Sequence, residues 1–508
     1  MRESLFIAVD LGTSFIKTGV YDVKGNCAAQ ASEPVKDYRP EPGVFIQKGS
    51  ELFDSVLACV KDVTKQLNDK TSSIAAMVFS GQMSGFMGVD KNWEDITTWS
   101  CSLDTRYMPY AGRQMKDLRD DFLTVAGTNF PAMAPKYEWY KTEFPSESEK
   151  IAKYLMISGY VIGKLGNLNI EDAIIDRSYI SWTGLADVGK GVWSGKICTA
   201  LGLDKKYLPQ IVDCNYVCGK LAPEYARILG LPSGIPLVAG AGDKVAGCLG
   251  AGNVESGRVV FEASSYGEVS CCVKDYRPDI TERRLDVLCS AVPGEFYVTH
   301  FAAGSGITLD WFVDNFYRRH DEDKKAAFAR IEKAILGMPI GSQGLMSIGL
   351  LGGSSMPIDG VLRGLWMGYD WSHKPEHFYH SLLESFTYDF ALALGSADRL
   401  YPELKFSEVR VIGGGAKSPE WIQMNADTSG KKYTTLKMND VSMWGAVILA
   451  GNGVGVFPDL KKTADSFIKI DKTYEPREEE GAIHRKHLEY YKAALTEMRS
   501  FFDKLQKL

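Results

Sequence analysis

The sequence predicts an α/β protein with two related domains, and three observations support this prediction. The chain has 508 residues, which is more than one hydrophobic core usually supports. Its first 80 residues alternate strand-like runs, a turn and an amphipathic helical run, which is a mixed α/β pattern. A similar strand–turn–strand unit begins near residue 257. We therefore predict a domain change near residue 250, with domains of residues 1–250 and 251–508.

The first predicted unit is a strand, a hairpin, a helix and a further strand. Lys24-Gly25-Asn26 has the composition of a turn and separates the two hairpin strands. Apolar residues at helical spacing predict the helix, and Ser50 can cap its start. The expected elements are strands at 5–9, 15–21 and 27–32, a helix at 50–67 and a strand at 74–79.

The second predicted unit repeats the strand–turn–strand order in the other half of the chain. An apolar run at 235–239 comes just before it, and a charged helix is expected at the end of the chain. The other expected elements are strands at 257–262, 268–273 and 408–412 and helices at 418–428 and 478–508.

Glycine-rich turns follow three of these strands, at residues 10–14, 240–243 and 413–415. One such turn is weak evidence, but three across both halves fit a nucleotide held in a cleft between two domains. Neither common nucleotide motif is present, since Gly-x-x-x-x-Gly-Lys-Ser/Thr and a strand-to-helix Gly-x-Gly-x-x-Gly are both missing. The sequence therefore predicts nucleotide binding by another arrangement.

The turn at residues 10–14 combines groups that suit a metal ion and a phosphate. Asp10 offers the hard oxygen ligand that Mg²⁺ takes. Gly12 lets backbone N–H groups approach phosphate oxygens, and Thr13 and Ser14 add hydroxyl donors. Lys17 can reach back as a cation. The alternative is an ordinary exit from a strand.

Composition excludes several other classes of function. The net charge is −6 and no Lys/Arg block is present, so no nucleic-acid partner is expected. No apolar stretch is long enough to cross a bilayer, and the start of the chain lacks a signal-peptide pattern, so no membrane association is expected. Ten cysteines are scattered without a Cys-x-x-Cys pair, as in a cytoplasmic protein with reduced thiols.

Asp10-Leu11-Gly12-Thr13-Ser14, followed by Lys17, resembles the first phosphate motif of the FGGY carbohydrate kinases. The match continues in order along nearly the whole chain. The next stretch, Gly81-Gln82-Met83-Ser84-Gly85, is similar to the sugar-site turn of xylulokinases. In the first half of the chain, Asp104-Thr105-Arg106, Asp176 with Thr183-Gly184-Leu185-Ala186-Asp187, and Gly242-Asp243 also resemble family motifs. In the second half, the adenosine motif is matched by Ile412-Gly413-Gly414-Gly415-Ala416-Lys417-Ser418 with Trp421, Gln423, Ala426, Asp427 and Gly430. The resemblance implies two actin-like ATPase (ribonuclease H-like) domains with an interdomain cleft.

The resemblance also implies ATP and Mg²⁺ as cofactors and a role for each matching residue. Asp243 is the expected general base, although its place before Lys244-Val245-Ala246 also suits a helix N-cap. Asp10 is the expected Mg²⁺ ligand, acting through water. The expected substrate-binding residues are Gln82, Met83, Asp104, Asp176 and Asp243. The expected ATP-binding residues are Gly12, Thr13, Ser14, Lys17, Ser264, Gly304, Gly414, Gly415 and Ala416.

Four departures from the family pattern leave the sugar open. Ser84 stands where xylulokinases usually have His, and Ser102 stands where the family has Trp. Lys244 replaces the usual Asn or Gln after the catalytic aspartate. Ala263-Ser264-Ser265-Tyr266 replaces the second phosphate motif, Gly-Thr-Ser-Gly, although Ser264 keeps a hydroxyl where the family has Thr.

The first functional hypothesis is ATP-dependent phosphorylation of D-xylulose to D-xylulose 5-phosphate, with Asp243 as the base. A second is another FGGY substrate: ribulose, a polyol, gluconate or a signalling furanone derivative. A third is a non-catalytic, sugar-sensing protein with an actin-like fold. The expected partner is a small sugar, and a homodimer is one possible assembly.

Overall fold

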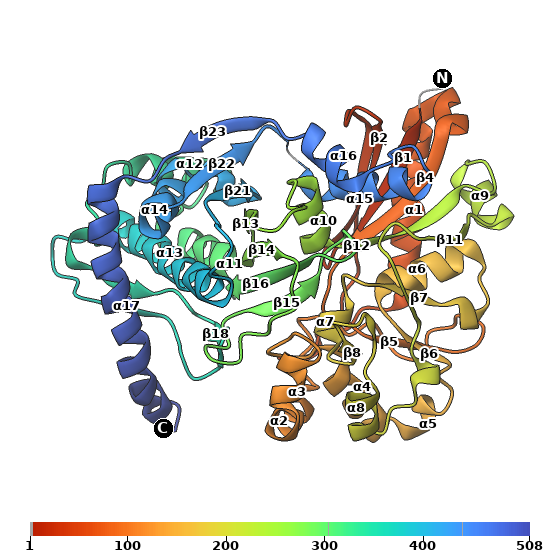
Figure 1. Cartoon of the computed structure of the whole chain (residues 1–508), viewed down its shortest axis with the longest axis horizontal. Coiled ribbons are helices and arrows are strands. Elements are labelled where there is room, and N and C mark those ends of the chain that lie inside the picture. Colours follow the sequence, from red (N-terminus) through yellow and green to blue (C-terminus); the bar gives the residue numbers. More distant parts are fainter. Residues whose placement is uncertain (1–3, 303, 439, 508) are drawn as a thin grey trace.

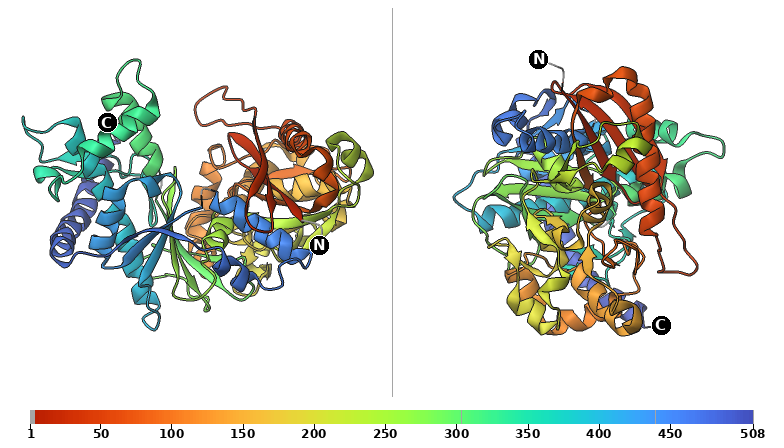
Figure 2. Two further views of the ribbon diagram at one scale, coloured as in Figure 1. Left: turned by 90° about the horizontal axis from the view of Figure 1, so that it is seen from above. Right: turned by 90° about the vertical axis from the view of Figure 1, so that its right-hand side faces the viewer.

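The computed structural model describes residues 4–302, 304–438 and 440–507 and contains two large β-sheets (Figures 1 and 2). A six-stranded sheet has the order β11-β12-β4-β1-β2-β3, and a seven-stranded sheet has the order β15-β16-β14-β13-β21-β22-β23. Figure 1 shows the two sheets in opposite halves of the molecule, with helices packed around both. The predicted α/β class is confirmed.

The first sheet contains the predicted N-terminal unit. β1 pairs antiparallel with β2 and parallel with β4, which in turn pairs parallel with β12. The carboxyl ends of β1, β4 and β12 therefore lie at one edge of the sheet. The strands of this sheet are β1 (Leu5–Leu11), β2 (Phe15–Asp22), β3 (Cys27–Pro34), β4 (Ile74–Gly81), β11 (Val217–Lys220) and β12 (Pro236–Gly242).

A bulge in β12 sets where this strand ends. The register with β4 shifts between Val238 and Ala241. Gly240 lies in the shift with a φ of +79°, and a Cβ there would lie 1.7 Å from the carbonyl oxygen of Phe79. Only glycine fits this close backbone approach. After the bulge Gly242 lies opposite Gly81, so the two strands end level.

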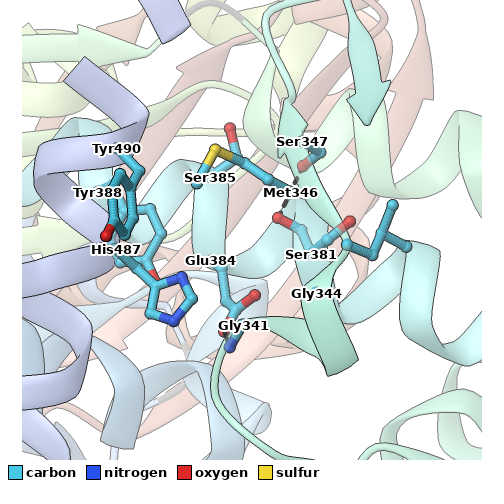
Figure 3. Close-up of a pocket in the computed structure, with 11 residues that line it drawn as sticks. Gly341, Gly344, Met346, Ser347, Ser381, Glu384, Ser385, Tyr388, His487 and Tyr490 are labelled. Atoms are coloured by element: carbon cyan, nitrogen blue, oxygen red, sulfur yellow. Dashed lines mark hydrogen bonds between the residues drawn. The ribbon is translucent and has the colours of Figure 1, made fainter. Parts of the chain in front are cut away.

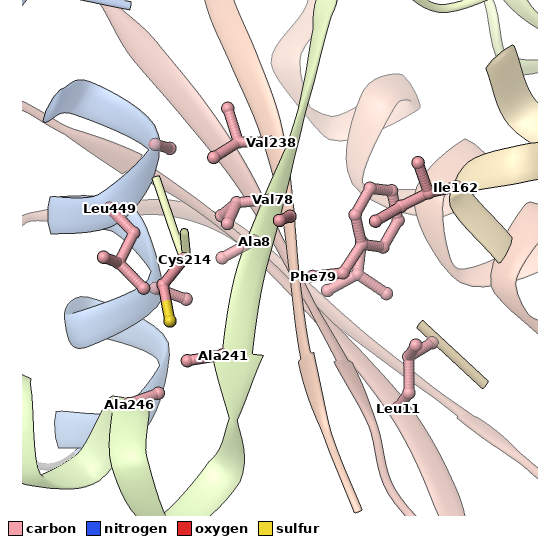
Figure 4. Packing of buried hydrophobic residues seen from close by; sticks show 14 of the residues in the cluster. Ala8, Leu11, Val78, Phe79, Ile162, Cys214, Val238, Ala241, Ala246 and Leu449 are labelled. Carbon is pink, nitrogen blue, oxygen red and sulfur yellow. The ribbon is translucent and has the colours of Figure 1, made fainter. Parts of the chain in front are cut away.

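Helices cover both faces of the first sheet. Figure 4 shows Leu449 of α15 on one side of the strands and Ile162 of α6 on the other. The helix predicted at 50–67 is α1, but its N-cap is Lys48 and not Ser50, whose N–H instead donates to Asp95. The helices that pack on the sheet are α1 (Gly49–Leu67), α6 (Ile157–Gly166), α10 (Asp243–Gly250) and α15 (Val441–Gly453). α9 (Pro223–Leu229) packs on α1, and α16 (Leu460–Ser466) packs on α15.

Two of these helices, α10 and α15, approach each other through glycines. A Cβ on Gly445 of α15 would lie 1.9 Å from the carbonyl oxygen of Ala246, and a Cβ on Gly250 of α10 would lie 2.0 Å from that of Val441.

α15 and α16 follow residue 250 in the chain, yet they join the core of the first sheet, as the blue helices beside β1 and β4 show in Figure 1. The domain division at residue 250 stays a prediction.

The second sheet repeats the scheme of the first. β13 pairs antiparallel with β14 and parallel with β21, as β1 does with β2 and β4. The repeat predicted from the turn-linked strands is confirmed. Its strands are β13 (Val259–Glu262), β14 (Gly267–Val273), β15 (Asp286–Cys289), β16 (Phe296–Ala302), β21 (Glu408–Ile412), β22 (Lys432–Leu436) and β23 (Ile470–Tyr474). Its helices are α11 (Ser305–Phe312), α12 (Lys324–Ala334), α13 (Pro375–Leu400), α14 (Pro419–Ser429) and α17 (Glu478–Leu505).

The remaining α-helices and strands are short. In the first half they are α2 (Met108–Asp117), α3 (Arg119–Thr124), α4 (Met133–Glu143), α5 (Pro145–Ser148), α7 (Ile180–Thr183) and α8 (Gly195–Ala200), with the strand pairs β5 (Met87–Val89) and β6 (Lys153–Leu155), β7 (Ile174–Asp176) and β10 (Gln210–Val212), and β8 (Ala186–Asp187) and β9 (Val192–Trp193). In the second half they are the pairs β17 (Met346–Ile348) and β20 (Leu365–Met367), and β18 (Ser354–Ser355) and β19 (Ile358–Asp359).

The ten cysteines are all free thiols, and most are buried. Within the part of the chain that the structure describes, no helix is both long enough and apolar enough to cross a membrane. The expected homodimer stays a prediction.

The glycine contact between α10 and α15 gives a stability prediction. Gly445→Ala should lower the free energy of unfolding by about 1–3 kcal/mol, because the new methyl group meets backbone that cannot rotate away. Gly112→Ala is the control. Gly112 lies on α2 with open space around it, so alanine should raise stability by up to about 1 kcal/mol. Urea unfolding followed by circular dichroism measures both, and an unchanged midpoint for Gly445→Ala would contradict the close packing.

Candidate active site

The strand ends of the first sheet bring the predicted catalytic groups together. Asp10 is the penultimate residue of β1, Gln82 follows β4 and Asp243 follows β12. The Gln82 N–H donates to the Leu11 carbonyl (3.2 Å), and Thr13 Oγ1 donates to Gln82 Oε1 (3.2 Å). One edge of the sheet therefore carries a carboxylate, the first phosphate turn and the predicted base.

Asp243 is the first residue of α10, whose N-cap is Gly242. Its Oδ1 accepts the N–H of Lys244 at 2.8 Å, and among the residues described its Oδ2 accepts no hydrogen bond. Burial raises the pKa of Asp243 to about 7; the Lys244 ammonium opposes this shift, and the carboxylates of Glu262 and Asp10 add to it. A carboxylate that exchanges its proton near neutral pH suits a general base.

Asp10 lies in the same acidic neighbourhood. Burial raises its pKa to about 6, Lys17 opposes the shift, and Asp440 and Glu262 add to it. No group of three or more His, Cys, Asp or Glu side chains that could hold a metal is found within residues 4–302, 304–438 and 440–507. One or two carboxylates still fit Mg²⁺, because that ion keeps several waters and takes further ligands from substrate phosphates.

The turns that end β13 and β21 form the predicted nucleotide side. The Ala263 N–H donates to the Ile412 carbonyl (2.9 Å), and the Gly415 N–H donates to the Ala263 carbonyl (2.8 Å). Gly413 has a φ of +86°, which favours glycine, and a Cβ on Gly414 would meet open space. The two turns are therefore joined by backbone hydrogen bonds, and Gly414 offers bare backbone to a ligand.

The start of α11 joins the same group of turns. The Ile307 N–H donates to the Ser265 carbonyl (3.2 Å), and the Gly267 N–H donates to Ser305 Oγ (2.9 Å). Gly304, the N-cap of α11, has a φ of +86°. The structure thus brings together the five ATP-binding residues predicted in the second half of the chain: Ser264, Gly304, Gly414, Gly415 and Ala416.

Gln82 and Met83 lie beside the predicted base. The Met83 side chain packs on Gly242, where a Cβ would lie 2.5 Å from Met83 Cγ. The Gln82 side chain is buried, and its Nε2 has no hydrogen-bond partner in the described part of the chain. An unused buried donor next to Asp243 is suited to a sugar hydroxyl.

Asp104 is fully buried and already has partners. Arg106 donates from Nε to Oδ1 and from Nη2 to Oδ2, both at 2.8 Å, and Ser100 Oγ donates to Oδ2 at 2.8 Å. This arrangement is a bidentate ion pair with a hydroxyl added. Asp104 therefore orients Arg106, which is partly exposed, and its own contact with a sugar stays a prediction.

Asp176 is linked through Ser178 to the turn that carries the predicted base. The N–H and Oγ of Ser178 donate to Asp176 Oδ1, and Ser178 Oγ accepts the Gly242 N–H at 2.8 Å. Asp176 is fully buried, and burial raises its pKa to about 7. The structure therefore gives Asp176 a role in holding the turn that carries Asp243, and its predicted contact with a sugar is untested.

Sequence reasoning missed three contributors to this site. Glu262 ends β13 as Asp10 comes at the end of β1, so the strand repeat is a signal that could have identified it. Arg106 belongs to the Asp104-Thr105-Arg106 motif, but the motif predicts no separate role for it. Ser178 had no sequence signal, because its role depends on the meeting of two chain segments.

A separate cavity of about 190 Å³ lies in the second half of the chain between α13 and α17 (Figure 3). Glu384 is buried there, and it accepts the Gly341 N–H (2.6 Å) and the Ser342 hydroxyl (2.8 Å). Its lining also includes Tyr388, His487 and Tyr490. No residue predicted for the active site lines this cavity.

Family models match both halves of the chain. Residues 5–250 match the N-terminal domain of the FGGY family of carbohydrate kinases, and residues 270–453 match its C-terminal domain. The chain belongs to the FGGY family. It is a carbohydrate kinase, which is a phosphotransferase with an alcohol group as acceptor, and it has the family's two-domain, actin-like (ribonuclease H-like) fold. The FGGY resemblance and the predicted enzyme class are both confirmed.

Relatives with different substrates cover nearly the whole chain. The xylulose kinase of Staphylococcus epidermidis is 26% identical, with 97% of each chain covered. The gluconokinase of Bacillus licheniformis is 24% identical over 95% of this chain and 94% of its own. The autoinducer-2 kinase of Yersinia enterocolitica is 24% identical over 98% of this chain and 95% of its own.

Solved structures agree on the fold. A gluconate kinase from Lactobacillus acidophilus superposes with a TM-score of 0.89 at 21% identity, covering 99% of this chain and all of its own. A ligand-bound xylulose kinase from the same organism superposes with a TM-score of 0.88 at 21% identity and the same coverage.

The hydrogen bond from the Gly242 N–H to Ser178 Oγ gives a prediction about the turn that carries Asp243. Ser178→Ala leaves the buried Gly242 N–H without its acceptor, so it should cost about 1–3 kcal/mol of stability and lower kcat about 10- to 100-fold. Ser181→Ala is the matched control, because Ser181 is equally buried and its Oγ has no partner in the described part of the chain. Thermal unfolding and steady-state kinetics measure both. Equal behaviour of the two variants would remove Ser178 from this role.

Proposed function

We propose that this chain phosphorylates D-xylulose to D-xylulose 5-phosphate with ATP, and that Asp243 is the general base. The observation that carries the proposal is the Asp243 carboxylate, held at the start of α10 beside Asp10 and Gln82 with a pKa of about 7. The identity with named xylulose kinases supports the choice of sugar.

In this mechanism Asp243 accepts the proton of the sugar's terminal hydroxyl as that oxygen attacks the γ-phosphorus. The bond from the γ-phosphorus to the ADP oxygen breaks, so the products are the sugar phosphate and ADP. Gln82 Nε2 donates to a sugar hydroxyl. The Thr13 hydroxyl, which donates to Gln82 Oε1 in this structure, and the Ser264 hydroxyl, which donates to the Tyr266 carbonyl, turn to donate to phosphate oxygens when ATP binds. Asp10 would hold Mg²⁺ through water, and the bound ion would supply positive charge to the phosphates.

A second candidate is the same reaction on gluconate, an autoinducer-2-type furanone, ribulose or a polyol. The names of relatives at 24% identity favour the first two. Ser84 and Ser102, where xylulokinases have larger side chains, lie on the predicted sugar side. The third candidate, a non-catalytic sugar sensor, has no specific observation in its favour.

The base assignment is tested by Asp243→Asn, which keeps the shape and removes the proton acceptor. Its kcat should fall about 100- to 10,000-fold while the sugar KM stays within a few-fold. Asp62→Asn, on an exposed face of α1, is the control and should behave as wild type. A coupled ADP-release assay measures both over D-xylulose, D-ribulose, D-gluconate, glycerol and the furanone. Near-normal turnover by Asp243→Asn would exclude the base role, and wild-type turnover of another sugar alone would replace D-xylulose.

The pKa of Asp243 sets the acid limb of the pH profile. Since the base works only when ionised, kcat/KM for the sugar should be flat above about pH 8 and fall tenfold per pH unit below about pH 7. Initial rates from pH 5.5 to 9, with saturating ATP and Mg²⁺, measure it. A profile that stays flat down to pH 5.5 would show that the base is a carboxyl with an ordinary pKa.

A further inference from the structure

Lys244 links the two sheets at the active site. It follows Asp243 in the first turn of α10, and its side chain extends to the turn between β13 and β14. Its Nζ lies 2.8 Å from Glu262 Oε1, 3.3 Å from Ser264 Oγ and 3.3 Å from the Tyr266 carbonyl oxygen. One ammonium therefore sits between the predicted base and the predicted second phosphate turn.

Glu262 contacts this ammonium, and Glu268 interacts with it at longer range. The Lys244 side chain is 13% exposed and the Glu262 side chain 19%. Glu268 of β14 is fully buried, and its Oε1 accepts the hydroxyls of Ser270 (2.8 Å) and Thr299 (2.6 Å). Burial opposes the charge of Lys244, but Glu262 and Glu268 hold its pKa above the usual value, so it is a cation at neutral pH.

The charge of the site explains why a cation is needed there. Asp10, Asp243, Glu262 and Glu268 all repel the anionic tail of a nucleoside triphosphate. Lys17 offsets Asp10 on the side of the first turn. Lys244 is the cation that offsets Asp243 on the side of the second turn.

We propose that Lys244 is a phosphate-binding residue of this kinase, whose ammonium exchanges the Ser264 and Tyr266 oxygens for γ-phosphate oxygens when ATP binds. Both contacts at 3.3 Å are long bonds to uncharged oxygens, whereas an ammonium binds phosphate through shorter, charge-assisted bonds. The flexible lysine stem permits this movement while the Lys244 backbone stays in α10. The inference rests on the proposed function only in taking ATP as the phosphoryl donor.

Equilibrium binding tests the proposal without turnover. An ATP analogue with a non-hydrolysable β–γ bridge, ADP and AMP are titrated with Mg²⁺ into wild type and Lys244→Met by calorimetry. We expect Lys244→Met to bind the ATP analogue about 10- to 100-fold more weakly, the loss of a charge-assisted bond, with AMP unchanged within twofold. Lys244→Arg, which keeps the charge, should retain most of the affinity for the ATP analogue.

A matched control separates phosphate binding from a structural ion pair. Lys461 donates to the buried Glu295 at 2.6 Å, on α16 and away from the predicted phosphate turns. Lys461→Met should lower the melting temperature and leave the affinity for all three nucleotides within twofold. If Lys244→Met folds too poorly to titrate, Lys244→Gln supplies the same measurement with a side chain of similar length and no charge.

Three results would overturn the proposal: equal losses for the ATP analogue and AMP, no loss beyond twofold for the ATP analogue, or a loss confined to the sugar KM. Its failure is distinguishable from failure of the proposed function. A wild-type protein that phosphorylates no sugar in the panel, yet shows the expected nucleotide series, would refute the function and leave the role of Lys244 standing. Turnover of D-xylulose by wild type, with identical nucleotide affinities in wild type and Lys244→Met, would support the proposed function and refute the role of Lys244.

Discussion

The parallel register of β1, β4 and β12 is the constraint on which the candidate active site depends. Asp10, Gln82 and Asp243 lie at the carboxyl ends of these three strands. A slip of one residue in the register would turn Asp10 to the other face of the sheet. The register is held by burial on both faces, which explains the nearly continuous apolar runs in these strands. The bulge at Gly240 then brings the end of β12 level with that of β4, so that α10 begins with Asp243 at the shared edge.

The predicted nucleotide side also depends on parallel strands that end at one edge of a sheet, in this case the second sheet. The turns after β13 and β21 meet because these strands are parallel neighbours, and the hydrogen bond from Gly415 to Ala263 joins the turns. The two edges are then connected through α10, which packs on α15 through glycines and sends Lys244 to the second turn. The close approach of the helices and the position of the ammonium are therefore parts of one arrangement.

Local signals in the sequence were enough for the strands and their turns, but not for the partners of buried polar groups. The apolar run at 5–9 predicts a strand, and the glycines at 413–415 predict the turn that follows the strand at 408–412. β1 and β21 lie where these patterns place them. α15 is apolar on all sides, so nothing local says that it packs on the first sheet. Asp176 has the chemistry of a sugar ligand, yet its burial against Ser178 follows from tertiary contacts that no spacing reveals.

Lys244 contacts both Asp243 and the turn between β13 and β14. Lys244 follows Asp243 in α10 and its backbone N–H donates to the Asp243 carboxylate, so the lysine stays next to the proposed base wherever its ammonium points. The ammonium lowers the pKa of Asp243 against the effect of burial, and so favours the ionised form that the proposed base requires. A neutral residue at this position would leave the effect of burial on the pKa of Asp243 less opposed. One side chain therefore helps to keep Asp243, the proposed base, ionised and holds a positive charge at the turn that we propose binds phosphate.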